Sequence, residues 1–239
     1  IVIAWFISLG VLIFQRDLGT SVLFFGLFVS MLYIATQRRS WLIIGFFLFL
    51  GGAYFAYANF GHVQARVTVW LDPWSYADTT GYQIVQSIYG LANGGILGAG
   101  LGQGFPNLVP FASTDFIVAA LGEELGVTGI FVILLLYAIL IERGLRTAIT
   151  CRDGFGQLLA AGLSITFALQ VFVIIGGVTG LIPLTGLTTP FLSYGGSSLV
   201  ANWVILALLL RISDRSRRPD LSKVSPDDAM TQVVPRVNQ

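Results

Sequence analysis

Long stretches without a charged residue constrain this chain more than any other feature. Only 10% of its residues are Asp, Glu, Lys or Arg, against about 25% in soluble domains. A membrane-spanning helix needs ~20 mostly apolar residues, and the charge-free runs supply them. The run from Gly154 to Leu210 is too long for one span, and GVTGLIPLTGLTTP breaks it with Gly and Pro residues that stop helices. The sequence therefore predicts an all-α polytopic membrane protein.

Six spans follow from these runs. The fourth has its apolar core at 125–141 and is predicted to begin nearer Phe116. The chain starts Ile-Val-Ile-Ala-Trp, with no Met and no basic segment, so we interpret it as part of a longer protein and not as a chain with a signal peptide. The approximate bounds of the spans are 1–15, 18–37, 40–60, 125–141, 156–178 and 190–210.

The basic residues sort to one side of this topology. Of the 13 Lys and Arg residues, all but Arg16 and Arg66 fall on the side that holds the short loops after the second and fourth spans and the C-terminal tail. The positive-inside rule makes that side cytoplasmic. We expect a membrane domain over 1–213 and a disordered cytoplasmic tail over 214–239, because the tail is polar and contains Pro.

The loop between the third and fourth spans, about residues 61–114, is predicted to lie outside the cell. Loops beyond ~15 residues are usually functional or disordered, and the aromatic residues of this one argue against disorder. Trp70 fits an interfacial aromatic belt or a sugar-stacking residue. GYQIVQSIYGLA has helical spacing, with Gln83 and Gln86 as polar members, and predicts a short amphipathic helix in the membrane interface.

Three acids stand out where this loop enters the fourth span. Asp115, Glu123 and Glu124 lie within FPNLVPFASTDFIVAALGEELG. Carboxylates this near the bilayer are costly and point to function, although capping of a helix start is the alternative interpretation. The single Cys151 and single His62 argue against a disulfide and against a Cys or His metal cluster.

Five motifs occur in a fixed order on this topology, and together they resemble one bacterial family. The resemblance is to the shape, elongation, division and sporulation (SEDS) proteins of the RodA and FtsW group, and it covers about residues 1–213, closer to RodA. The motifs are QRDLGTS (15–21), RVTVWLDPW (66–74), TGYQIVQSIYGLANGGILGAGLGQG (80–104), STDFIVAALGEELG (113–126) and GLIPLTGLTTPFLSYGGSS (180–198).

This resemblance implies a ten-span fold of which six spans are present here. It implies a peptidoglycan glycosyltransferase in the bacterial inner membrane that polymerises lipid II at the outer face and works beside a class B penicillin-binding protein. Asp115 stands at the family's essential acid. The family's functional Lys lies upstream of this chain, and Arg16 replaces a Pro that the family usually has in QRDLGTS. Nucleic acid is not expected as a partner.

The chemistry of lipid II polymerisation suggests roles for these residues. A sugar hydroxyl attacks an anomeric carbon with inversion, and a carboxylate can act as the general base, so Asp115 is the catalytic candidate. Undecaprenyl pyrophosphate leaves and needs cationic help. We expect Arg66 to supply this positive charge. A divalent cation, Mg²⁺ or Mn²⁺, bound by Asp115 and the diphosphate is a further candidate. Headgroup contact is the alternative for Arg66.

Further substrate-binding candidates remain open to structural interpretations. Glu123 faces either a polar cavity or the helix packing around it. Ser193 and Ser197 either contact substrate or permit close helix packing and a broken helix start. The full set of substrate-binding candidates is Arg66, Trp70, Gln83, Gln86, Glu123, Ser193 and Ser197.

Two other functions fit the sequence in part. A flippase for lipid-linked sugars would use broken helices and polar residues at mid-membrane depth, but the acids here gather at one face. A non-catalytic scaffold for the crosslinking enzyme would need no acid at position 115.

Overall fold

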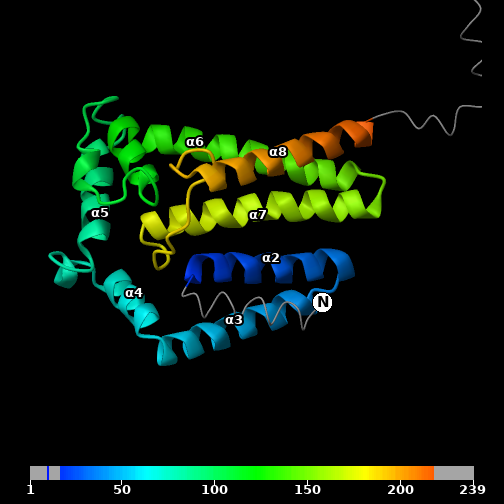
Figure 1. Ribbon diagram of the computed structural model, residues 1–239, viewed down its shortest axis with the longest axis horizontal. Coiled ribbons are helices and arrows are strands. Elements are labelled where there is room, and N and C mark those ends of the chain that lie inside the picture. Colours follow the sequence, from blue (N-terminus) through cyan, green and yellow to red (C-terminus); the bar gives the residue numbers. More distant parts are fainter. Residues whose placement is uncertain (1–9, 11–16, 218–239) are drawn as a thin grey trace, which may run out of the picture.

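Helices make up every regular element that the structure describes. The structure is a computed structural model, and it describes Gly10 and residues 17–217. Five of its helices are long and apolar enough to cross a membrane, so the chain is a multi-pass membrane protein. They lie side by side in Figure 1 and are α2 (Leu18–Thr36), α3 (Ser40–Asn59), α6 (Ile117–Thr150), α7 (Gly154–Val178) and α8 (Gly196–Arg217).

These five helices confirm the second to sixth predicted spans, while the first, 1–15, lies outside the described residues, as does Arg16. Local capping explains two of the helix starts. The Asp17 carboxylate accepts a hydrogen bond from Thr20 N at 3.0 Å at the start of α2. Asp153 accepts one from Gly156 N at 3.1 Å at the start of α7. Each carboxylate satisfies a backbone donor that the first helical turn leaves unpaired.

Small residues let the central helices approach closely. A Cβ built on Gly144 of α6 would lie 2.1 Å from Ser164 Oγ of α7, so a larger residue there would require the Ser164 side chain or the helices to move. The same cluster of buried residues contains Ala148, Ala160 and Ala161, together with Leu209 of α8. Small residues at such contacts are typical of membrane helices, because lipid provides no hydrophobic force to drive helices together.

The predicted outer loop folds into helices at one end of the bundle. It contains α4 (Gly61–Leu71), η1 (Trp74–Tyr76), α5 (Tyr82–Gly94) and η2 (Pro106–Leu108), of which α4 and α5 are labelled in Figure 1. The sequence predicted the helix α5 but not α4. A hydrophobic core beneath the loop joins Val69 of α4 and Ile84 of α5 to Phe116 and to Val178 of α7. Side chains of α5 are thus buried in protein.

A kink in α6 fixes the loop that follows α5. Gly126 has φ 70° and ψ −173°, which interrupts the helix. Residues 95–100 then pair with the backbone groups around the interruption: Val127 N donates to Gly95 O at 3.0 Å, and Ala99 N donates to Glu123 O at 2.9 Å. Because buried backbone groups need partners, the glycine-rich loop and the kink stabilise one another.

The last span begins later and ends later than predicted. Residues 179–195 are not helical, and α8 runs from Gly196 to Arg217 instead of from 190 to 210. The positive φ of Phe191 (62°) is incompatible with an earlier helix start, because a residue in the left-handed region cannot belong to a right-handed helix. The helix also includes residues 214–217, which were assigned to the tail, and residues 218–239 lie outside the described part of the chain.

Candidate functional site

The non-helical segment between α7 and α8, residues 179–195, is the centre of the candidate site. Two side chains of α4 hold its first half. Trp70 Nε1 donates to Gly180 O at 2.7 Å, and Arg66 Nη1 donates to Leu184 O at 3.0 Å and to Thr185 O at 3.2 Å. These bonds join residues more than a hundred positions apart in sequence, so the outer helix α4 determines where the segment lies.

Residues just before α6 hold the second half of the segment. Ser193 Oγ donates to Thr114 O at 2.6 Å and accepts a hydrogen bond from Thr189 N at 2.7 Å. Tyr194 N donates to Ser113 O at 2.8 Å. Ser193 therefore connects the segment to the backbone that immediately precedes Asp115.

Asp115 is half-buried against this segment. A Cβ built on Gly186 would lie 3.6 Å from Asp115 Oδ2, and Gly186 has a φ of +75° that favours glycine. Burial raises the pKa of the Asp115 carboxyl, while the Thr114 side chain and the charge of Arg66 act in the opposite direction and lower it. Partial desolvation makes a carboxylate a stronger base than one in water, which suits proton abstraction.

Glu123 lies in a different environment. Its side chain is buried, and Asn93 Nδ2 of α5 donates to its Oε1 at 2.9 Å. Glycines of the outer loop leave little space around it, since a Cβ built on Gly104 would lie 3.2 Å from Glu123 Cδ and one on Gly90 would lie 3.5 Å from Oε2. This placement favours the structural interpretation of Glu123 over contact with a substrate.

The structure brings only some of the predicted site residues together. Arg66, Trp70, Asp115 and Ser193 meet at the 179–195 segment. Gln83 and Gln86 lie half-buried on α5, and Ser197 is exposed in the first turn of α8. The sequence did not predict that backbone carbonyls of residues 180–185 accept hydrogen bonds from Arg66 and Trp70, because these bonds join positions far apart in the chain.

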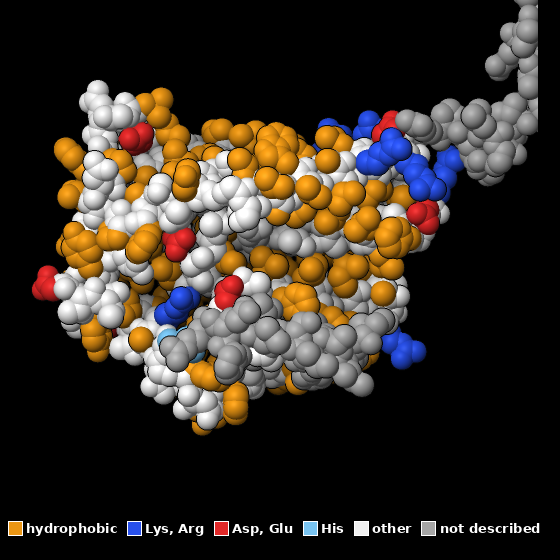
Figure 2. All heavy atoms as spheres, viewed as in Figure 1, with side chains coloured by type: hydrophobic (Ala, Val, Ile, Leu, Met, Phe, Trp, Pro, Cys, Tyr) orange, Lys and Arg blue, Asp and Glu red, His pale blue; other side chains and the backbone are white. Residues whose placement is uncertain are grey.

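Charge is distributed unevenly around the bundle. On the face drawn in Figure 2, basic side chains gather where α6 and α8 end, while a further basic patch lies near α4 at the opposite end. Among the described residues no group of three or more His, Cys, Asp or Glu side chains is placed to hold a metal ion.

Comparison with known proteins identifies the family. Residues 1–218 match the FtsW/RodA/SpoVE family, described as cell cycle proteins. The chain belongs to this family. It is 58% identical over 238 residues to a protein of Mycobacterium tuberculosis named peptidoglycan glycosyltransferase RodA, covering 98% of this chain and 51% of that protein. It is 40% identical over 213 residues to a probable peptidoglycan glycosyltransferase FtsW of Geobacter metallireducens, covering 88% of this chain and 57% of that protein.

The predicted resemblance is thereby confirmed, including the greater similarity to RodA. The chain spans about half the length of the curated relatives it matches. A chain from a structure described as a peptidoglycan synthase complex that coordinates polymerization and crosslinking shares the fold, with TM-score 0.73 and 29% identity over 89% of this chain and 60% of that one. A RodA rod shape determining protein of Thermus thermophilus, a point mutant, matches with TM-score 0.57 at 24% identity, covering 89% and 55%.

Proposed function

We propose that the protein containing this chain is a peptidoglycan glycosyltransferase that polymerises lipid II into glycan strands. The observation that carries the proposal is the half-buried Asp115, which is fixed beside the 179–195 segment and has a pKa raised by burial. The curated relatives named peptidoglycan glycosyltransferases RodA and FtsW support it. We place the reaction at the outer face of the bacterial inner membrane, where α4 and α5 cover one end of the bundle, with the C-terminus in the cytoplasm.

Asp115 acts as the general base in this proposal. It takes the proton from a hydroxyl of one sugar while that oxygen attacks the anomeric carbon of another. The bond to undecaprenyl pyrophosphate breaks in the same step, so an α-linked donor becomes a β-linked strand without a covalent enzyme intermediate. A positioned base of this kind contributes ~10²–10⁴-fold to the rate.

Arg66 contributes the cationic side of the site. Its Nη1 holds the carbonyls of Leu184 and Thr185, and the other donors of the guanidinium can bind diphosphate oxygens. Arg66 thus shapes the segment and stabilises the leaving group. A divalent cation, Mg²⁺ or Mn²⁺, would be held by Asp115 and diphosphate oxygens, which are the hard oxygen ligands that such ions prefer.

A class B penicillin-binding protein is the expected partner, because newly made strands must be crosslinked. The structural neighbour is a component of a complex described as combining polymerization with crosslinking, which supports this assignment.

Substitution of Asp115 separates enzyme, flippase and scaffold. In the full-length protein, Asp115→Ala should abolish glycan synthesis from purified lipid II while binding of the partner persists. A flippase would be expected to lose lipid II translocation across vesicles, and a scaffold would keep all its functions. Normal polymerisation by Asp115→Ala would remove Asp115 from the catalytic role.

A further inference from the structure

A concave surface lies at the opposite end of the bundle from the candidate site. It is a groove of about 570 Å³ between α6 and α8, near the ends of both helices (Figure 1). Arg143 and Arg146 of α6 and Arg217 of α8 line its polar part. Leu140, Leu206 and Leu210 line its apolar part. We call this surface the α6–α8 groove.

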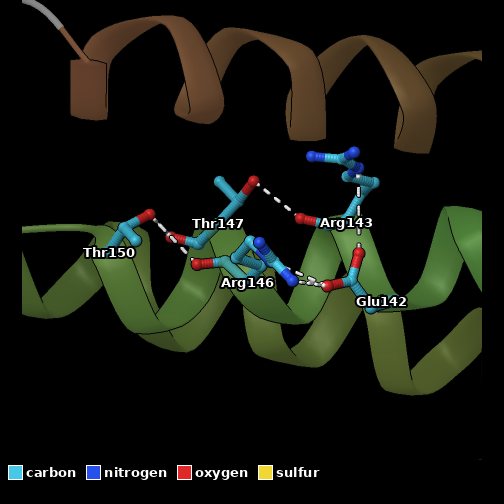
Figure 3. A network of polar contacts seen from close by, with 5 residues as sticks. All are labelled: Glu142, Arg143, Arg146, Thr147 and Thr150. Atoms are coloured by element: carbon cyan, nitrogen blue, oxygen red, sulfur yellow. Dashed lines mark hydrogen bonds and ion pairs between the residues drawn. The ribbon is translucent and has the colours of Figure 1, made fainter.

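The arginines of the groove keep an excess of positive charge. Glu142 is the acidic side chain that forms ion pairs with them among the described residues: its Oε1 accepts from Arg146 Nε at 2.7 Å, and its Oε2 lies 3.7 Å from Arg143 Nε (Figure 3). All three side chains are substantially exposed, so these pairs are weak. The described lining of the groove therefore holds three arginines and no acidic residue, and Glu142 beside it pairs with two of them.

The two threonine hydroxyls in the lining of the groove already donate to the main chain. Thr147 Oγ1 donates to Arg143 O at 2.9 Å, and Thr150 Oγ1 donates to Arg146 O at 3.0 Å (Figure 3). Their protons are therefore already used by the main chain of α6. The C-terminal ends of α6 and α8 also carry partial negative charge, so the positive charge that attracts an anion to this position comes from the guanidinium groups.

A neighbouring groove between α7 and α8 provides the contrast. It is also lined by two arginines, Arg211 and Arg215, but Asp153 and Asp214 lie in the same lining. Its basic and acidic residues are equal in number. The α6–α8 groove therefore carries a net positive charge in its lining, whereas the charges in the lining of the neighbouring groove balance.

We propose that the α6–α8 groove binds the headgroup of an anionic phospholipid. The guanidinium groups of Arg143 and Arg217 take the phosphate oxygens in bidentate hydrogen bonds, and an acyl chain follows Leu206 and Leu210 towards the bilayer. A lipid fits better than free phosphate because the lining is apolar below the arginines and belongs to two membrane-spanning helices. Basic pockets between membrane helices are suited to such headgroups.

The test compares two double variants with equal loss of charge. The full-length protein and its Arg143→Gln/Arg217→Gln and Arg211→Gln/Arg215→Gln variants are purified in detergent. Binding of phosphatidylglycerol and of phosphatidylcholine is measured by native mass spectrometry at increasing lipid concentration. At ~1 kcal/mol for each Arg near an anionic headgroup, loss of Arg143 and Arg217 should weaken phosphatidylglycerol binding roughly 30-fold. The Arg211 and Arg215 variant should bind within about threefold of the wild type.

Three results would overturn the proposal. Equal loss in both double variants would show that general charge, and not this groove, attracts the lipid. Equal affinity of the wild type for phosphatidylcholine would show that the headgroup charge is not recognised. Phosphatidylglycerol binding that appears only after removal of residues 219–239 would show that the chain's own C-terminal residues occupy the groove. Thermal unfolding of each variant checks that the fold is retained, as expected for exposed side chains.

Discussion

Ser193 offers a sharp test of how the candidate site is held together. Its hydroxyl donates to Thr114 O and accepts from Thr189 N, and both Ser193 and Thr189 are buried. Ser193→Ala would leave a partly buried acceptor, Thr114 O, and a buried donor, Thr189 N, without this partner. Each such group costs about 1–3 kcal/mol, so we expect about 2–4 kcal/mol of lost stability when some water access is allowed for.

Activity should fall with stability, because the same hydrogen bonds fix the backbone next to Asp115. A displacement of about 1 Å can cost ~10²-fold in rate, so the turnover of lipid II should fall about 10–100-fold. The effect on stability should be present without substrate, which separates a positioning role from substrate contact. Thermal unfolding in detergent and initial rates of glycan synthesis by the full-length protein provide the two measurements.

Ser197→Ala is the matched control for this prediction. Ser197 is exposed in the first turn of α8, and surface substitutions of this kind usually change stability by less than about 0.5 kcal/mol. If Ser193→Ala and Ser197→Ala unfold at the same temperature and polymerise at the same rate, the network around Ser193 does not position Asp115.

Three further outcomes are expected from the same structure. Arg66→Lys should lower the rate of glycan synthesis by ~10–100-fold, since Lys cannot hold two carbonyls and phosphate oxygens in one fork; equal rates at every Mg²⁺ concentration would make Arg66 an anchor only. Gly126→Ala should destabilise the protein in thermal unfolding far more than Gly102→Ala, because both have positive φ but only a Cβ at Gly126 meets backbone atoms, at 2.4 Å; similar unfolding temperatures would show that the kink relaxes. Cys at Ser75 should react with an impermeant thiol reagent in intact cells and Cys at Ser40 should not, and the reverse labelling would overturn the predicted orientation.

Span positions were predictable from the sequence because they depend on local composition. The runs 18–37 and 40–60 match α2 and α3 to within a residue, and 156–178 ends where α7 ends. Bilayer thickness sets the length of an apolar helix, and a charged or capping residue marks where it can begin. Neither property requires knowledge of distant contacts.

The 179–195 segment shows what the sequence could not reveal. Gly and Pro residues predicted a break, but not its extent to Gly196, because the segment is held by side chains far away in the sequence. Arg66 and Trp70 reach it from α4, and Gln170 Nε2 donates to Thr188 O at 2.9 Å. The role of Arg66 in holding Leu184 O and Thr185 O was missed for the same reason.

For Glu123 the sequence left two interpretations open, a side chain in a polar cavity or one packed between helices. Its carboxylate lies near Asp115 in sequence, and periodicity could not tell a cavity from a packed interface. Pairing with Asn93 and the close approach of Gly104 depend on how α5 and the glycine-rich loop fold back on α6. Those contacts become visible only in three dimensions.

The dependence of kcat/KM on pH tests the central claim, that Asp115 is the general base, most directly. For lipid II polymerisation by the full-length protein, activity should fall at low pH as the Asp115 carboxylate takes up a proton. Because burial raises the pKa of Asp115, this fall should begin at a higher pH than for a carboxyl in water. The residual activity of Asp115→Asn, reduced ~10²–10⁴-fold, should lack this acidic limb. An acidic limb that persists unchanged in Asp115→Asn would assign the titrating base to another residue.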